Sequence, residues 1–214
     1  MMDTPKSLGD SEHRTQRLDR RHEPHVNELT VLVDRIRRER RCGDAVPYFD
    51  PADGGVQAEC LFVLEAPGRK AVGSGFISRD NPDESAKNWL ELNAEAGVPR
   101  GRTAICNIVP WYIGSGGRIR PANSTDIGEG WPYLLQLLDM LPRLRVVVLV
   151  GRRAQRVAPR LHATRPDVRL MTCPHPSPSF VNRKPQNRGL LLAALREVAV
   201  ALDLIVSPTA GSGR

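Results

Sequence analysis

Four short, almost uninterrupted apolar runs constrain the fold of this chain more than any other feature of its sequence. They are CLFVL (60–64), TAICN (103–107), RVVVLV (145–150) and VRLMTC (168–173). Each run is too short and too apolar to be an amphipathic surface helix. Runs of this kind are typical of strands that are buried on both faces, so we expect four core strands.

The intervals around these runs are long enough for helices. The expected helices cover residues 83–97, 125–142 and 151–163, with a closing helix near 186–203. Helical crossovers between successive strands make the strands parallel and place helices on both faces of the sheet. The sequence therefore predicts an α/β fold, a three-layer α/β/α sandwich with a central, mainly parallel four-stranded sheet.

The length of 214 residues is that of one domain. We expect a disordered tail over residues 1–22, a single domain over 23–206 and a flexible C-terminus over 207–214, because the first 22 residues are polar, charge-mixed and poor in aliphatic side chains. Apolar residues from Val26 to Ile36 recur at three- and four-residue steps, which predicts a first helix of the domain.

Composition excludes several classes of protein. No apolar run approaches the ~20 residues that a membrane span needs, and no hydrophobic signal segment opens the chain, so we expect a cytoplasmic protein. The four cysteines lie at least 18 positions apart, which excludes a CxxC metal site or a dense disulfide framework. We expect separate reduced thiols, no bound metal and no other cofactor.

The net charge of +7 is concentrated in one stretch. Residues 143–188 carry 11 basic side chains and one acidic side chain, Asp167. A surface of single sign suits a polyanion such as nucleic acid. The alternative is a solvated basic face in an arginine-rich chain, since arginine outnumbers lysine 27 to 4.

Ligands of open parallel sheets bind beyond the carboxyl ends of the strands, so the loops that follow the four runs are the candidate sites. Glu65 directly follows the first run and precedes a Pro-Gly turn, where its carboxylate could orient or deprotonate water. It could equally cap a following helix. His175 lies between two prolines after the last run, where a rigid imidazole could meet a developing negative charge. A structural histidine is the alternative.

Two further residues have the chemistry to bind a planar ligand. Asn107 ends the second run, and its amide donates and accepts side by side, as reading a base edge requires. It could instead close the turn before Pro110. Phe76 could stack on a flat ring or belong to the core.

Together, LEAPG (64–68), GSGF (73–76), Asn107 and HPSPS (175–179) resemble the motif set of the uracil-DNA glycosylase superfamily, in order and in spacing. The resemblance covers roughly residues 45–203. It implies that Glu65 activates or places the water, that Phe76 stacks on a flipped uracil, and that Asn107 reads the N3–H and O4 edge. His175 would donate a hydrogen bond to O2 of the leaving base, and the backbone at Ala66, Pro67 and Gly68 would contact the base.

The resemblance also implies a DNA-binding surface. Residues 178–183 would wedge into the duplex, where they offset the few kcal/mol that extruding a base costs. The expected DNA-binding residues are Ser177, Ser179, Phe180, Val181, Asn182, Arg183, Lys184, Arg188, Arg152 and Arg153.

The chain departs from its relatives at several positions. Ala66 stands where several branches carry a catalytic Asp or Asn. The iron–sulfur branch, which shares the Glu-Ala-Pro-Gly motif, has four clustered cysteines that this chain lacks. Residues 69–81 contain no histidine, so we expect no covalent trapping of the kind seen in another branch.

We therefore predict a monomeric, metal-free, nucleoid-associated DNA glycosylase that removes uracil and leaves an abasic site. It should be monofunctional, because the lysines nearest the site, Lys70 and Lys184, are better placed for phosphates than for a Schiff base. The alternatives are specificity for hypoxanthine or xanthine, a catalytically silent DNA-binding relative, and a hydrolase of small nucleotides or sugars.

Overall fold

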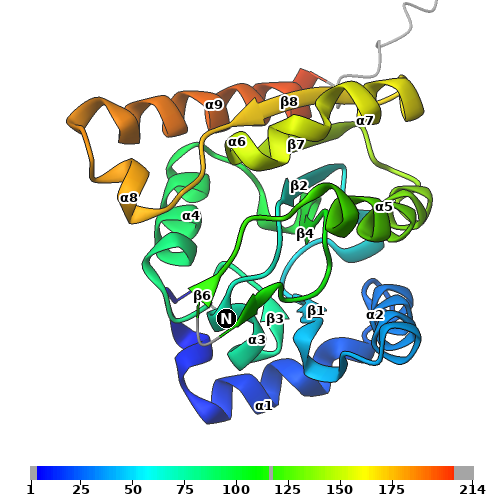
Figure 1. Ribbon diagram of the computed structural model, residues 1–214. Coiled ribbons are helices and arrows are strands. Elements are labelled where there is room, and N and C mark those ends of the chain that lie inside the picture. The colour runs from blue at the N-terminus through cyan, green and yellow to red at the C-terminus, as the bar shows by residue number, and fades with distance from the viewer. Residues whose placement is uncertain (1–3, 116–117, 205–214) are drawn as a thin grey trace, which may run out of the picture.

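A four-stranded parallel sheet forms the centre of the molecule, as a computed structural model that describes residues 4–115 and 118–204 shows (Figure 1). Its strands are β2 (Cys60–Leu64), β4 (Thr103–Asn107), β7 (Val146–Val150) and β8 (Arg169–Cys173). They lie in the order β4-β2-β7-β8, and each neighbouring pair is parallel. The four predicted strands are confirmed, each within one residue of its expected bounds.

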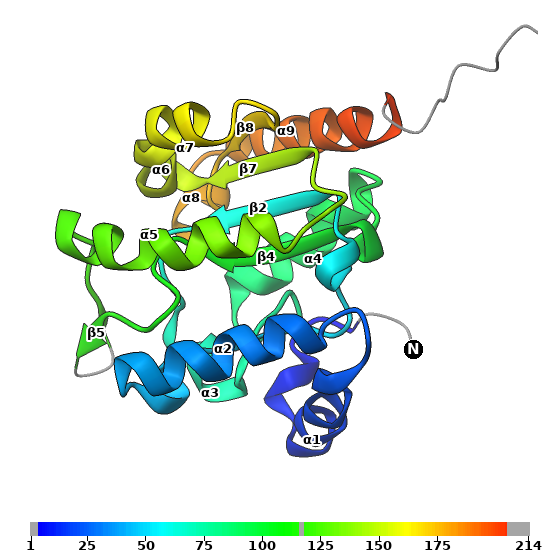
Figure 2. The same cartoon turned by 90° about the vertical axis from the view of Figure 1, so that its right-hand side faces the viewer.

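Helices cover both faces of this sheet (Figure 2). One layer contains α2 (Asn27–Arg40), α5 (Ser124–Asp139) and α7 (Ala158–Thr164), and the other contains α4 (Glu84–Glu95) and α9 (Pro185–Leu204). Strand side chains alternate between the layers, so Leu61 and Val63 belong to one core cluster and Phe62 to the other. The predicted three-layer α/β/α sandwich is confirmed.

The expected helix at 151–163 is broken into pieces. Its first turn is α6 (Gly151–Ala154), and a 3₁₀ turn (Gln155–Val157) separates it from α7. Pro159 lies in the first turn of α7, where its missing N–H costs nothing, whereas a continuous helix would need that N–H as a donor.

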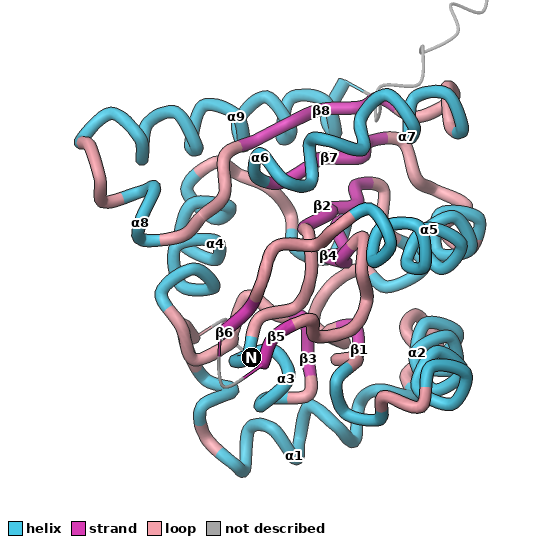
Figure 3. Tube along the Cα trace, in the orientation of Figure 1, coloured by secondary structure: helices cyan, strands magenta, loops and turns pink. Residues whose placement is uncertain are grey.

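The structure contains small elements that have no sequence period to reveal them. β1 (Tyr48–Phe49) pairs in parallel with β3 (Phe76–Ile77), and β5 (Gly114–Ser115) pairs antiparallel with β6 (Arg118–Ile119). Figure 3 shows the loops around β5 and β6 between the sheet and the N-terminal helices. Two short helices, α3 (Arg69–Ser74) and α8 (Pro178–Val181), follow β2 and β8.

The start of the chain differs from the disordered tail expected over residues 1–22. A 3₁₀ turn (Ser7–Gly9) leads into α1 (Ser11–Asp19), whose N-terminus is capped by the Asp10 carboxylate. Leu8 is fully buried, and Arg17 binds two buried carboxylates of the domain. The segment is ordered because its charged side chains pair with opposite charges inside the fold. Residues 1–3 and the expected flexible C-terminus, 207–214, lie outside the described residues.

Within the described residues, no helix is long and apolar enough to cross a membrane.

Candidate functional site

Glu65 lies at the carboxyl end of β2 in the centre of the sheet. One carboxylate oxygen, Oε1, accepts a hydrogen bond from the backbone N–H of Ala122 at 2.7 Å, and Oε2 accepts one from Nη1 of Arg153 at 3.1 Å. The Glu65 side chain is 18% exposed and the Arg153 side chain 49% exposed. The carboxylate is therefore oriented from two sides and still reachable by water.

Asn107 lies at the end of the neighbouring strand β4, paired in register with Leu64 of β2. The chain beyond it remains tied to β2, because Ile108 N–H donates to the Leu64 carbonyl at 2.9 Å and Val109 N–H to the Glu65 carbonyl at 3.0 Å. Gly130 of α5 packs against this stretch so closely that a Cβ would lie 2.3 Å from the Ile108 carbonyl oxygen. The position of Asn107 is thus fixed by backbone contacts on both sides.

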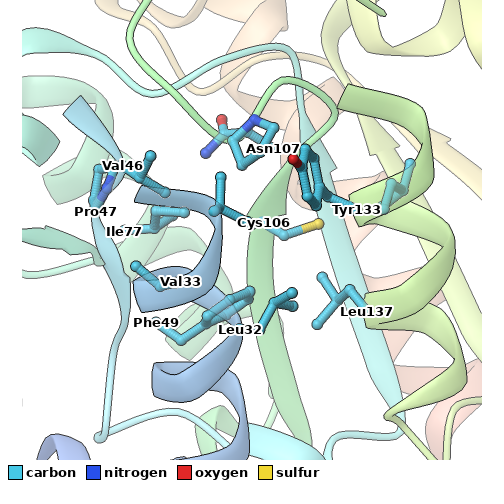
Figure 4. A pocket seen from close by; sticks show the side chains of 13 residues that line it. Leu32, Val33, Val46, Pro47, Phe49, Ile77, Cys106, Asn107, Tyr133 and Leu137 are labelled. Atoms are coloured by element: carbon cyan, nitrogen blue, oxygen red, sulfur yellow. The ribbon is translucent and has the colours of Figure 1, made fainter. Parts of the chain in front are cut away.

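The Asn107 amide has unused binding capacity. It is 6% exposed, and its Nδ2 finds no hydrogen-bond partner among the described residues. Figure 4 shows it at one end of a small apolar cavity between α2, β4 and α5. The cavity volume of about 20 Å³ is enough for one water molecule and too small for a pyrimidine. A buried donor without a partner is costly, so this amide is a strong candidate for binding a ligand.

His175 follows β8, and its ring has a defined proton arrangement. The backbone N–H of Ser177 donates to Nδ1 at 3.1 Å, so Nδ1 is the unprotonated nitrogen and the neutral ring carries its proton on Nε2. Burial lowers the pKa of His175 below its ordinary value; the carboxylates of Asp83 and Glu65 oppose this shift, and the Arg153 guanidinium supports it. His175 is therefore a neutral donor near pH 7.

Gly151, the residue that joins β7 to α6, makes room for the imidazole. Its φ of +82° lies in the left-handed region, and a Cβ there would meet the Cβ of His175 at 3.0 Å. Only glycine combines this backbone conformation with so close an approach. The packing of α6 onto the His175 loop thus depends on one residue.

The predicted wedge divides into buried and exposed parts. Ser179, Asn182 and Arg183 are exposed, as is the neighbouring Lys184, whereas Val181 is buried in the core cluster and Phe180 packs against it. Asn187 Nδ2 fixes the segment by donating to the Phe180 carbonyl at 2.7 Å. The exposed part can meet DNA, and the apolar part anchors α8.

The predicted phosphate-binding cations also divide. Arg152, Arg183 and Lys184 are exposed and have no acidic partner within the part of the chain that the structure describes. Arg153 pairs with Glu65, and Arg188 pairs with Glu95. Two of the five expected phosphate contacts are thus engaged in ion pairs.

Phe76 differs most from its expected role. Its side chain is fully buried in β3, and its ring centroid lies 6.3 Å from that of Tyr48. No face of the ring is open to a ligand in this structure, and the next residue, Ile77, lines the Asn107 cavity instead. The pairing of β1 with β3, which the sequence did not reveal, turns Phe76 into the core.

The motif backbone after Glu65 is partly accessible. Pro67 is buried, Ala66 is partly buried, and Gly68 is exposed at the N-terminus of α3. The backbone of this turn can therefore be reached from the same edge as Glu65.

Asp83 is a site residue that sequence reasoning missed. It caps α4 by accepting a hydrogen bond from Ala86 N–H at 2.9 Å, and its charge acts on His175. Asn88 of the same helix donates from Nδ2 to the Pro176 carbonyl at 2.9 Å. An Asp before a predicted helix indicates a cap, but only the fold brings it to His175, 92 positions away.

The cysteines show no sign of reactivity. Burial raises the pKa of the Cys60 and Cys106 thiols and that of Cys173 to about 12. Among the described residues, no group of three or more His, Cys, Asp or Glu side chains could hold a metal ion.

Comparison with known proteins identifies the family. The model of the uracil DNA glycosylase superfamily matches residues 51–199. Among solved structures, the crystal structure of wild-type SMUG2 from Pedobacter heparinus superposes with a TM-score of 0.54 at 13% identity, covering 85% of this chain and 86% of that one. The NMR structure of a candidate uracil DNA glycosylase from Methanosarcina acetivorans gives 0.47 at 13% identity, covering 67% and 92%.

No curated protein sequence matches the chain significantly. The family match nevertheless spans the sheet, helices α4 to α7, most of α9 and every predicted site residue from Glu65 to Arg188. On that evidence the chain belongs to the uracil DNA glycosylase superfamily, whose membership supports a DNA glycosylase.

Proposed function

We propose that this protein hydrolyses the N-glycosidic bond of uracil in DNA and leaves an abasic site. The observation that carries the proposal is the buried Asn107 amide, whose Nδ2 has no partner among the described residues at the edge where Glu65 and His175 also lie. Superfamily membership supports the glycosylase chemistry, and the side chains of this edge support uracil as the base.

Asn107 is the residue that would recognise the base. An amide side chain presents a donor and an acceptor next to each other, which matches the O4 and N3–H of uracil. Binding would satisfy the free Nδ2 donor, so a base without this edge would leave the buried amide unpaired and bind more weakly.

His175 would stabilise the departing base. Cleavage leaves the electron pair of the bond on uracil, and the negative charge that develops on O2 needs a donor. The neutral ring with its proton on Nε2 offers that donor, and the Ser177 N–H keeps Nδ1 from competing as one.

Glu65 would act on the sugar side. A carboxylate near C1′ stabilises an oxocarbenium-like sugar and accepts a proton from the attacking water. Its contacts with Ala122 and Arg153 orient the carboxylate while it stays partly exposed. With Ala66 in the neighbouring position, Glu65 is the acidic group of this motif that remains for the role.

The exposed cations of the same edge, Arg152, Arg183 and Lys184, would bind phosphates of a single- or double-stranded substrate. Lys70 and Lys184 are exposed and are better placed for phosphates than for a Schiff base, so we propose a monofunctional, metal-free enzyme that works as a monomer on DNA in the cytoplasm and nucleoid.

Single-turnover excision from oligonucleotides with one uracil, hypoxanthine or xanthine tests the proposal. We expect release of uracil by the native protein and a loss of about 10²–10³-fold in rate for His175→Ala, the usual cost of removing one such donor. Asn107→Ala should weaken excision with a matched fall in uracil binding, and Glu65→Gln should slow hydrolysis. Gly75→Ala, which introduces a Cβ with no neighbour within 4 Å, is the control for general damage.

Release of a purine base in place of uracil would overturn the proposed specificity for uracil and support hydrolysis of the N-glycosidic bond. DNA binding without release of any base, unchanged in His175→Ala, would overturn the enzyme and favour a silent DNA-binding protein. Salt-independent activity on free nucleosides would point to a small-molecule hydrolase, because only a polyanion binder loses affinity steeply with salt.

A further inference from the structure

The N-terminal strap, residues 6–17, packs on the loop that joins β3 to α4 (Figure 1). Leu8 donates its backbone N–H to the Asp80 carbonyl at 3.0 Å, and its side chain is fully buried. Lys6 forms an ion pair with Glu84, the first residue of α4. The strap therefore contacts this loop at its middle and at its end.

Charged groups inside the domain anchor the strap. Arg17 binds the carboxylates of Asp50 and Asp80, which are 2% and 1% exposed. Arg100 binds the same two carboxylates, at 2.8 and 3.1 Å. Because buried ionic contacts are expensive to break, Arg17 connects α1 to the β3–α4 loop more firmly than a surface pair would.

The loop leads directly to the candidate site. It ends at Asp83, whose carboxylate caps α4 and acts on His175. One turn later, Asn88 donates to the carbonyl of Pro176, the residue after His175. A continuous set of contacts therefore runs from Arg17 through Asp80 to the start of α4 and the His175 loop.

We propose that the N-terminal strap positions the start of α4, and with it Asp83 and the His175 loop, for the reaction. Arg17 and Leu8 are positioning residues in this scheme, since neither contacts the groups that would touch DNA. The effect on rate rests on the proposed function, whereas the effect on the position of α4 does not.

The environment of His175 provides a readout that a general loss of stability would not change. The charged groups that act on its ring are Asp83 at the start of α4, Glu65 after β2 and Arg153 on α6. If the start of α4 moves away, His175 loses one of its two negative neighbours, and its pKa falls further below the ordinary value.

Hydrogen–deuterium exchange of the full chain tests the placement. In Arg17→Met we expect amides of residues 78–88 to exchange at least about tenfold faster, while amides of β7 keep their native protection. Gln16→Ala changes an exposed residue on the same helix and is the matched control. In the same variants, NMR titration of His175 should show a lower pKa for Arg17→Met only, and single-turnover excision should fall about tenfold.

Leu8→Ala gives an independent test in case Arg17→Met fails to fold, because it loosens the strap tip and leaves the buried ion pairs in place. Fast exchange confined to residues 6–17, with residues 78–88 and the His175 titration unchanged, would overturn the inference. If the protein excises no base, the proposed function fails, but exchange and titration still decide whether the strap positions α4.

Discussion

Two clusters of polar side chains in this molecule differ in how far they are buried and paired with other charges of the chain. The buried ion cluster consists of Asp50, Asp53, Asp80, Arg17, Arg79 and Arg100. Its members are largely removed from water and form ion pairs with one another, although Asp53 Oδ2 and Arg79 Nε have no hydrogen-bond partner among the described residues. The site at the carboxyl edge contains Glu65, Asn107 and His175. Here the Glu65 side chain is 18% exposed, Asn107 Nδ2 has no partner among the described residues, and the neutral His175 ring carries its proton on Nε2.

Polar groups of this fold can therefore be assigned roles by how far they are buried and paired within the chain. In the buried ion cluster, the charged side chains form ion pairs with one another. These pairs hold the N-terminal strap and the β3–α4 loop against the domain. At the carboxyl edge, Asn107 Nδ2 has no partner among the described residues, and Glu65 is held by one backbone N–H and one half-exposed arginine. We therefore expect substitutions in the first cluster to change stability and substitutions in the second to change chemistry.

The largest effect should come from Arg100→Met. Arg100 contacts all three carboxylates of the buried ion cluster, at 2.8 Å to Asp50 and Asp53 and 3.1 Å to Asp80. Removing one partner of a buried ionic network leaves uncompensated charge, so the free energy of unfolding in urea should fall by about 3–5 kcal/mol.

Arg188→Met is the matched control, because its pair with Glu95 is about half-exposed and water replaces the lost contact. Equal losses for the two variants would show that the buried ion cluster is no more important to stability than a surface ion pair.

The second prediction concerns the pH dependence of stability. Burial raises the pKa of Asp53 to about 6, above its ordinary value of 3.8, although Arg79 and Arg100 oppose the shift. The folded state therefore binds this proton more tightly than the unfolded state does, and stability falls as pH rises from about 4 to about 6. Asp53→Asn should flatten that part of the profile by up to about 3 kcal/mol, measured by urea unfolding between pH 4 and 7.

Asp167→Asn, at an exposed surface pair, should leave the same pH window unchanged. A native profile that rises with pH from 4 to 6 and is not altered by Asp53→Asn would mean that Asp53 is ionised throughout.

The third prediction concerns Gly151, whose substitution should affect both the stability of the fold and the position of His175. Gly151→Ala should cost about 1–2 kcal/mol of stability, because a left-handed conformation strains any residue with a Cβ. It should also displace His175, whose Cβ would lie 3.0 Å away, and reduce excision by about 10²-fold.

Gly75→Ala has the same strain, with a φ of +84°, and no neighbour within 4 Å. Comparable losses of excision in the two variants would show that strain alone, and not the contact with His175, is responsible.

The parts of this structure that the sequence predicted are those decided by local patterns. The four strands were identified from apolar runs, and the same runs placed Glu65, Asn107 and His175 at or just beyond the carboxyl ends of strands. The roles of these three residues stay predictions. The burial of Phe76 was not predicted because the β1–β3 pair joins residues 28 positions apart that have no local period. The ordered strap was missed for a similar reason, since Arg17 finds its carboxylates 33 and 63 positions away.

The smallest effect should come from Arg152→Ala at the carboxyl edge. Arg152 is exposed on α6 and has no acidic partner among the described residues, so its loss should leave unfolding nearly unchanged. If it binds one phosphate, the slope of log K against log salt for duplex binding should become less steep by about 0.9. Arg169→Ala removes another exposed cation, at the start of β8 on the amino-terminal edge of the sheet, and should leave the slope unchanged. A slope that responds equally to both changes would mean that DNA is attracted by net charge alone, whereas a response confined to Arg152 would place the DNA path at the edge that holds Glu65, Asn107 and His175.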